Sequence, residues 1–367
     1  MTTKKLFHQI HLWLGVIIGI LFFIIAFSGA ILSWQPELKS IVFKQKIDIQ
    51  NKPFVLPSDL KKTMDAEFPK GDYRTAFFRD KDRTCEVLLY GQGTYYIAQL
   101  NPYTAELIHL QDMNKGWLSV VVKLHRNLML GKFGRQVVHW VTLAFLVLMI
   151  TGLVIWWPVN KSGAKDRLTL KWGVSPKKLN YDLHNVLGFY ATWISIFAVV
   201  TGLFWGFEMV KGSLKYVTGE TGVVYEKPKS EVVVDRKETN QFKIMDSLTL
   251  VYRNKYPTLY FRISNPHTED DPIRAVLIKP GAMGEANMHF YHNRYTGEEI
   301  RGNFMHGPGD QISTYERLHS MVYDIHFGSI AGFPGRLLVF FATLIASSLP
   351  ITGFIVWLGK RKSSQAA

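Results

Sequence analysis

Four long apolar runs punctuate the chain, and each is free of Asp, Glu, Lys and Arg. They extend over Leu12–Trp34, Val137–Trp157, Val186–Phe207 and Leu337–Leu358. A helix rises about 1.5 Å per residue, so about 20 apolar residues cross the roughly 30 Å of a bilayer core. The first run follows Lys4 and Lys5 as a secretory signal would, but it exceeds the usual signal core of about 7–15 residues, and we expect it uncleaved. The pattern predicts a membrane protein with four spanning helices.

The two long segments between these runs, 35–136 and 209–332, have a different pattern. Short alternating stretches are separated by Gly, Asn and Pro, which is typical of strands joined by turns. The predicted strands are Thr84–Leu89, Thr94–Leu100, Leu259–Ile263, Ala275–Ile278 and Asn287–His292. Amphipathic helices are expected over Trp117–Leu130 and Tyr315–His326. Each segment is therefore predicted to be a small α+β domain whose last helix leads into a span.

An internal repeat relates the two halves of the chain. At an offset of 173, His11 meets His184 and Ser28-Gly29 meets Thr201-Gly202. At an offset of 201, His125 meets His326, Thr151-Gly152 meets Thr352-Gly353, and Arg135 meets Arg336. The unit of span, outer domain, amphipathic helix and span thus occurs twice in the same orientation. Parallel copies imply a pseudo-two-fold axis along the membrane normal.

The predicted fold is a four-span α-helical membrane bundle with two extracytoplasmic α+β domains. Its parts are the cytoplasmic N-terminus with the first span (1–34), the first outer domain with its amphipathic helix (35–136), the second span (137–157), a cytoplasmic connector (158–185), the third span (186–208), the second outer domain with its helix (209–332), the fourth span (333–358) and a cytoplasmic tail (359–367).

Composition and charge refine this picture. At 47% hydrophobic and 14% aromatic residues, the chain is rich for a soluble protein. Lys and Arg gather before the first span, in the connector and in the tail, and they predict that these parts face the cytoplasm. The residues concerned are Lys4, Lys5, Lys161, Lys165, Arg167, Lys171, Lys177, Lys178, Lys360, Arg361 and Lys362. The net charge of +14 is thus mainly a topology and lipid-headgroup signal, and we expect no nucleic-acid partner.

Four histidines that obey the repeat are the main candidates for chemistry. The predicted axis brings His11 and His184 to one depth near the cytoplasmic face, and His125 and His326 to one depth near the outer face. Two facing imidazoles can ligate one haem iron, so two pairs predict two b-type haems. The only cysteine, Cys85, excludes a disulfide, a cysteine-ligated iron–sulfur cluster and covalent C-x-x-C-H haem attachment. No Gly-x-Gly-x-x-Gly follows a strand, so a separate reductase or membrane quinol would donate electrons.

Several neighbouring residues have alternative or supporting roles. His139 lies inside the second span, and it is the alternative outer ligand to His125, although its repeat mate is Phe340. Arg135 and Arg336 are candidate partners of haem propionates at the outer face. At the inner face the candidates are Lys4 and Lys5 or Lys177 and Lys178. His8 and His319 are expected to be structural, and the Ser/Thr-Gly steps are expected to serve helix packing.

With these residues in hand, the chain resembles the PepSY-associated transmembrane proteins, bacterial inner-membrane proteins whose paired spans surround outer PepSY modules. The resemblance covers nearly the whole chain. It rests on His11-Leu12-Trp13-Leu14-Gly15, Leu124-His125-Arg126 with Gly134-Arg135, Leu183-His184-Asn185-Val186-Leu187-Gly188, and Tyr323-Asp324-Ile325-His326-Phe327-Gly328 with Gly335-Arg336. The ferrioxamine reductase type in this family looks like a di-haem protein that reduces iron in ferric siderophores. His139 is not carried over from the family.

The resemblance implies an inner-membrane protein that transfers electrons through haem to a ferric siderophore or another ferric chelate on the outer side. Such a protein is a ferric-chelate reductase with lipid, the chelate and an electron donor as partners. A second interpretation is a protein without haem whose outer domains bind peptides or modulate a peptidase or sensor partner. A transporter is a third interpretation, which the lack of Asp, Glu, Lys and Arg in the spans disfavours.

Overall fold

The computed structural model describes residues 3–43, 46–158, 167–233, 240–280, 287–308 and 311–365. Four helical segments in it are long and apolar enough to cross a membrane, which confirms the four predicted spans. They are Thr3–Leu32, Gly131–Trp156, Pro176–Gly206 and Ser329–Gly359. Lys161 and Lys165, which the orientation argument uses, lie outside the described residues, as do the side chains of Lys360, Arg361 and Lys362.

Two of the spans are single continuous helices, α1 (Thr3–Leu32) and α5 (Gly131–Trp156). The third is composite: α7 (Pro176–Asp182), one π turn (Leu183–Leu187) and α8 (Gly188–Gly206). The fourth is α12 (Gly332–Gln365), which contains Pro350 and follows a short 3-10 turn. The predicted spans agree with these helices to within two residues at their C-terminal ends, except in α12, which continues past Leu358. All four helical segments begin earlier than the apolar runs, in more polar sequence.

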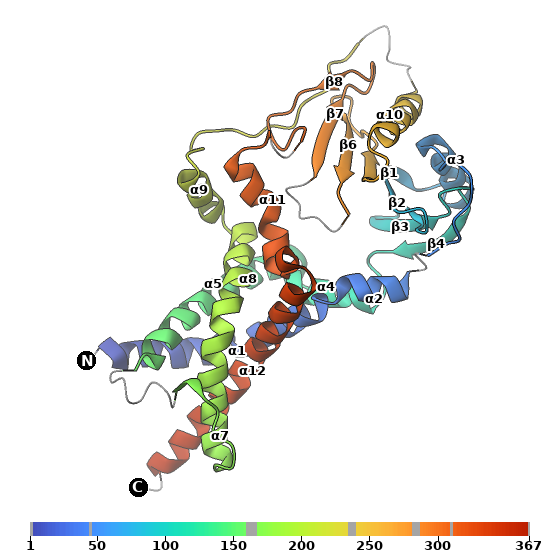
Figure 1. Cartoon of the computed structure of the whole chain (residues 1–367). Helices are drawn as coiled ribbons and strands as arrows, with labels where there is room; N and C mark the ends of the chain where they lie inside the picture. The colour runs from blue at the N-terminus through green and yellow to red at the C-terminus, as the bar shows by residue number, and fades with distance from the viewer. Residues whose placement is uncertain are drawn as a thin grey trace. The chain divides into compact units, whose positions relative to one another are not determined.

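The four helices form a bundle in which α1 packs against α5 and α12, and α8 packs against the same two helices (Figure 1). Apolar side chains from the bundle fill its middle. Phe22 of α1 and Phe145 of α5 stack with ring centres 3.8 Å apart. Met149 of α5 and Val199 and Leu203 of α8 belong to the same cluster. This packing holds together the helices that carry or contact the histidines.

The two predicted amphipathic helices are present as α4 (Trp117–Asn127) and α11 (Thr314–Phe327). Each ends just before a spanning segment. α5 begins at Gly131, and the turn that leads into α12 begins at Ser329. Two further short helices, α2 (Gln35–Val42) and α9 (Glu208–Val217), follow α1 and α8. The sequence analysis does not predict these two helices, because each is short and polar.

The second compact unit of the chain is a domain built on one antiparallel sheet of eight strands. The strand order is β4-β3-β2-β1-β5-β6-β7-β8. The strands are β1 (Asp72–Phe78), β2 (Cys85–Gly91), β3 (Thr94–Leu100), β4 (Leu107–Asp112), β5 (Tyr260–Ser264), β6 (Ile273–Ile278), β7 (Met288–His292) and β8 (Glu299–Ile300). All five predicted strands are present within two residues at each end. β1, β4 and β8 are additional.

Two helices, α3 (Pro57–Glu67) and α10 (Gln241–Lys255), cover one face of this sheet (Figure 1). Leu60 and Met64 of α3 and Met245 of α10 are almost fully buried against the strands. The helices come from different halves of the chain, yet they contribute to a single hydrophobic core. The sequence predicts two separate outer domains, whereas the structure merges their strands into one sheet.

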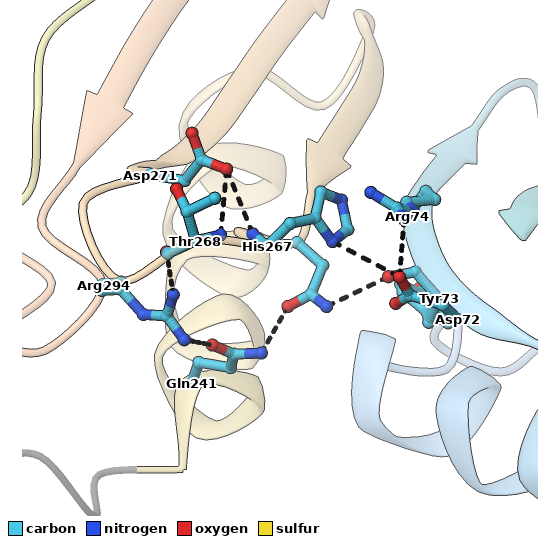
Figure 2. Close-up of polar contacts among 9 residues, drawn as sticks. Asp72, Tyr73, Arg74, Gln241, His267, Thr268, Asp271 and Arg294 are labelled. Atoms are coloured by element: carbon cyan, nitrogen blue, oxygen red, sulfur yellow. Dashed lines mark hydrogen bonds and ion pairs between the residues drawn. The ribbon is translucent and has the colours of Figure 1, made fainter. Parts of the chain in front are cut away.

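Pairing of β1 with β5 joins the two halves, and polar side chains reinforce the junction at one end. The Asn265 side chain donates to the Tyr73 carbonyl at 3.0 Å and accepts from Gln241 at 2.8 Å. Arg294 donates to Gln241, and His267 lies 3.7 Å from Asp72 (Figure 2). These contacts satisfy the side-chain amides of Asn265 and Gln241, whereas the Tyr73 hydroxyl and Arg74 Nε are buried without a partner among the described residues.

We expect the shared core to respond strongly to a single truncation. Leu277 of β6 is fully buried, so Leu277→Ala should cost about 2–5 kcal/mol through lost burial and a cavity. Leu250 of α10 is 51% exposed, and Leu250→Ala should change stability by less than about 0.5 kcal/mol. Thermal melting of the sheet, followed by circular dichroism in detergent, tests this difference. Equal melting temperatures for the two variants would contradict the assigned core.

Candidate functional site

The bundle brings the four repeat-related histidines together as two pairs. The ring centres of His11 and His184 lie 6.4 Å apart, and those of His125 and His326 lie 6.0 Å apart. We call these the first and second histidine pairs. In each pair one ring comes from each half of the chain, as the repeat predicts from sequence.

The spacing within the pairs fits two ligands on opposite sides of one metal ion. An imidazole nitrogen binds a metal such as zinc at about 2 Å and lies about 1 Å from its ring centre, so the two ring centres would be roughly 6 Å apart. Both measured separations agree with this value. Among the described residues no three His, Cys, Asp or Glu side chains converge on a metal position. A haem iron, which needs only two ligands from the protein, suits this donor set.

The hydrogen bonding of the ring nitrogens is a second observation that fits a bound metal ion. In all four rings Nδ1 lies within hydrogen-bond distance of an oxygen of a neighbouring helix or span. The partners are Thr151 Oγ1 for His11 (3.0 Å), the Ile25 carbonyl for His125 (2.9 Å), Thr352 Oγ1 for His184 (3.0 Å) and Thr201 Oγ1 for His326 (2.9 Å). Across the described part of the chain, no hydrogen bond occupies Nε2 of these rings. Anchoring of Nδ1 orients each imidazole and leaves Nε2 available to bind a metal ion.

Each imidazole lies against the glycine of one Ser/Thr-Gly step. A methyl group built on Gly152 would approach His11 Cε1 to 3.1 Å, and one on Gly353 would approach His184 Cε1 to 3.0 Å. At the second pair the corresponding distances are 2.9 Å from Gly29 to His125 and 3.8 Å from Gly202 to His326. At Gly29, Gly152 and Gly353 the missing side chain therefore makes room for the ring, whereas at Gly202 an added methyl group would be in ordinary contact. These steps seat histidines as well as packing helices, which is more than the sequence analysis assigns to them.

We call the Ser/Thr-Gly step that each histidine contacts its seat. In each half of the chain, the histidine associated with one span has its seat on the other span. His11 of α1 lies on Thr151-Gly152 of α5, whereas His125, just before α5, lies on Ser28-Gly29 of α1. The same exchange joins α8 and α12 through His184 and His326. The same local contact thus occurs four times at the offsets of 173 and 201 that relate the sequence.

The backbone around His184 has a local irregularity. His184 lies in the π turn Leu183–Leu187, where the helix is wider than an α-helix. Single π turns inside α-helices occur frequently at functional sites. Its mate His11 lies in regular α1. The irregularity was not visible in the apolar pattern, because it changes no residue type.

Electrostatics favours neutral rings in the second pair. Burial, with a smaller contribution from the neighbouring His125, lowers the pKa of His326 to about 4. Burial also lowers the pKa of His125 from its usual value, against a hydrogen bond to Ile25 that raises it. Both imidazoles are therefore neutral at pH 7. The neutral form is the one that binds a metal ion.

The two pairs lie far apart along the bundle. Gly29, the seat of His125, follows His11 by 18 residues in the same helix. At 1.5 Å per residue this is about 27 Å along the axis, close to the roughly 30 Å thickness of a hydrocarbon core. The pairs therefore lie near opposite ends of the spanning segments.

The structure gives His139 a different setting. Its ring packs against Gly206, where an added methyl group would lie 2.8 Å from Cγ, and its centre is 6.1 Å from that of Phe207. Nδ1 is buried and has no hydrogen bond among the described residues. Its recorded ring contact is with Phe207, whereas His125 faces another imidazole. The pairing geometry therefore favours His125 over His139 as the partner of His326.

The arginines and lysines that are candidate partners of haem propionates lie close in sequence to the histidines of the pairs. Arg135 is exposed in the first turns of α5, and the Arg336 guanidinium lies 5.6 Å from the Phe333 ring centre in the first turns of α12. Lys177 and Lys178 line a cavity of about 280 Å³ at the end of α12, together with Ser175, Tyr181 and Val356. Lys178 pairs with Asp182 at 2.6 Å. His319 contacts Tyr315, as expected for a structural residue.

One residue of the second pair's surroundings was not among the sequence candidates. The Trp205 ring centre lies 5.0 Å from that of His326, in an edge-on contact. Trp205 lies four residues after Thr201, so it belongs to the same face of α8 as the seat of His326. That spacing is the signal that would have found it.

The fold and the site define the class of protein: a helical membrane protein with a β-sheet domain and two facing histidine pairs in its bundle. The family model described as PepSY-associated TM region matches residues 8–360. The match covers nearly the whole chain, so the chain belongs to this family, as the resemblance in the sequence indicates. No curated protein matches the chain.

Proposed function

We propose that the protein is a di-haem electron-transfer protein of the bacterial inner membrane that reduces ferric iron in siderophores or other chelates on the outer side. The observation that carries the proposal is the spacing of the two histidine pairs, in which no described residue is hydrogen-bonded to Nε2 of any of the four rings. His11 and His184 would hold one haem, and His125 and His326 the other. Bound haem supplies one-electron chemistry at a potential that its axial ligands and surroundings tune.

The chain's own residues hold and tune the ligands. Thr151, Thr352 and Thr201 fix the ring orientation through Nδ1, which also raises the basicity of Nε2. The apolar cluster that includes Phe22 and Phe145 lies along the helices between the two pairs. Arg135 and Arg336 are proposed to meet propionates at the second pair. His139 remains the alternative ligand that mutagenesis must exclude.

The overall reaction is one-electron reduction of Fe³⁺ to Fe²⁺ within its chelate. A membrane quinol that is oxidised to quinone gives two electrons and two protons, and thus reduces two ferric ions; a separate reductase is the other proposed donor. Hard oxygen donors hold Fe³⁺ much better than Fe²⁺, so the reduction releases the metal. The charge pattern supports cytoplasmic N- and C-termini, with lipid headgroups as partners of the basic ends.

A reduced-minus-oxidised visible spectrum of the purified, haem-replete protein tests the proposal. We expect a b-type α-band and a haem content of two per chain. Reduced protein mixed with a ferric chelate should reoxidise while Fe²⁺ appears in a colorimetric trap. A protein that stays free of haem when haem is supplied would overturn the proposal and support a peptide-binding or regulatory role.

A further inference from the structure

The second face of the sheet carries a row of mainly polar residues that the proposed function does not use. α3 and α10 cover the first face. Strand register aligns seven residues across the other face, one from each of seven strands. The row is His109, Gln99, Glu86, Phe77, Arg262, Val276 and His289. The row crosses the junction between the two halves of the chain, so both halves contribute to one face of the sheet. Gln99, Val276 and His289 are buried in it, and Arg262 is exposed.

Three arginines lie on or beside this row, and we call Arg79, Arg262 and Arg274 the arginine cluster. The guanidinium carbons of Arg79 and Arg262 lie 4.6 and 4.7 Å from the centre of the Phe77 ring. Arg274 lies 5.9 Å from the centre of the Tyr291 ring. Stacking on an aromatic ring holds a planar guanidinium while its N–H donors stay available at the edges.

The charge of the cluster is only partly balanced. Glu86 accepts from Arg79 at 3.0 Å. Arg262 and Arg274 have no carboxylate partner among the residues that the structure describes. Arg262 is exposed, so a ligand reaches it from solvent. Nε of Arg79 and of Arg274 is buried and has no hydrogen-bond acceptor in the described part of the chain. The cluster therefore carries an excess of positive charge, and Arg262 is the member that presents its donors to solvent.

His289 adds a buried donor to the same surface. It is 7% exposed, and its Nδ1 lies 2.6 Å from Nη2 of Arg274. Because arginine only donates, Nδ1 accepts and the proton must be on Nε2. Nε2 is buried with no acceptor among the described residues. His289 thus has hydrogen-bonding capacity that no described residue uses, beside Arg274.

We infer that this face binds the ferric chelate itself, and that it selects anionic chelates with carboxylate or catecholate oxygen donors. The inference rests on the proposed function for the identity of the bound metal complex. Oxygen atoms with negative charge match the donors of Arg262, Arg274 and His289, and the Phe77 and Tyr291 rings provide apolar contact for aryl groups. A neutral or cationic trihydroxamate complex lacks the charge that the arginine cluster complements.

Gallium complexes test binding without reduction, because Ga³⁺ is coordinated as Fe³⁺ is but accepts no electron under these conditions. Equilibrium dialysis of the full chain in detergent is performed with gallium citrate, a gallium tris-catecholate and a gallium trihydroxamate. We expect at least one anionic complex to bind, and the trihydroxamate to bind at least tenfold more weakly. The citrate and catecholate samples tell carboxylate from catecholate recognition. Equal binding of all three complexes, or binding of the trihydroxamate alone, would overturn the inference.

Charge-removing variants localise the binding. Arg262→Gln should weaken binding of the anionic complex at least tenfold, because the side chain is exposed and its loss leaves the core intact. Lys243→Gln on α10 removes the same charge from the helix-covered side and should bind as the unmodified protein does. Arg274→Lys, which keeps the charge but not the planar donor, should have an intermediate effect. Unchanged binding in Arg262→Gln would overturn the inference.

The two proposals fail in different ways. Gallium binding does not depend on haem, so a protein without haem that still binds anionic gallium complexes would overturn the proposed function alone. A protein with two haems that reduces ferric chelates of every charge equally, with no effect of Arg262→Gln, would overturn the inference alone.

Discussion

Replacing His184 by alanine is expected to lower the haem content from two per chain to one and to stop transfer of electrons to external ferric chelates. The variant removes one of the two proposed ligands of the first pair, whose ring centres are 6.4 Å apart. The second pair lies about 27 Å away along the helix axis, so its haem should be retained. Haem per chain and the α-band of the remaining haem are the measurements. His326→Ala should give the complementary result, with the first haem retained.

His139→Ala is the matched control for this prediction. It removes an imidazole from the same bundle, but the structure packs that ring against Gly206 and Phe207. We expect this variant to keep both haems. If His139→Ala loses the second haem while His125→Ala keeps it, the assignment of the second pair is wrong. If His184→Ala keeps two haems with unchanged spectra, the first pair is not a ligand pair.

The spans and the pairing of histidines were open to prediction from sequence for a simple physical reason. A bilayer requires long uncharged runs, and such runs are visible residue by residue. The match of His11 with His184 and of His125 with His326 needs only a constant offset. The third span nevertheless begins at Pro176, ten residues before the predicted Val186, because the polar turns of α7 extend the helix without adding hydropathy.

The seats of the histidines were harder to predict. The repeat aligns α1 with α8 and α5 with α12, whereas His11 contacts Thr151 and Gly152 of the helix that the repeat does not align with it. An offset reveals which positions are equivalent and says nothing about which positions touch. The Ser/Thr-Gly steps were visible as small residues, but only the three-dimensional packing assigns each one to a ring.

The local sequence pattern also could not predict that the two halves share a single sheet. Its two halves join where Thr75 of β1 meets Ser264 of β5, a pair separated by 189 residues. Each half alone has the alternation of an independent small domain. β1 was missed because a bulge between Tyr73 and Thr75 interrupts its alternation. Strand pairing over such a separation depends on the complementary edges and on the core shared by α3 and α10.

The glycines that contact the histidines allow a prediction in which all four histidines are kept. Gly29→Ala puts a methyl group 2.9 Å from Cε1 and 3.1 Å from Nδ1 of His125, so the ring must move away from its hydrogen bond to the Ile25 carbonyl. Loss of such a supporting contact typically weakens metal binding about 10- to 100-fold. We therefore expect the second haem to be lost during gel filtration or to show a shifted midpoint potential. The first haem should be unaffected.

Gly202→Ala is the matched comparison, because Gly202 is the repeat mate of Gly29 but lies 3.8 Å from His326 Cε1, an ordinary contact distance. This variant should retain the second haem much better than Gly29→Ala. In both cases alanine favours an α-helix over glycine by about 1 kcal/mol, so a loss confined to Gly29→Ala is not explained by a weakened helix. Equal haem retention and equal potentials in the two variants would show that the close approach of His125 to α1 does not position the ligand.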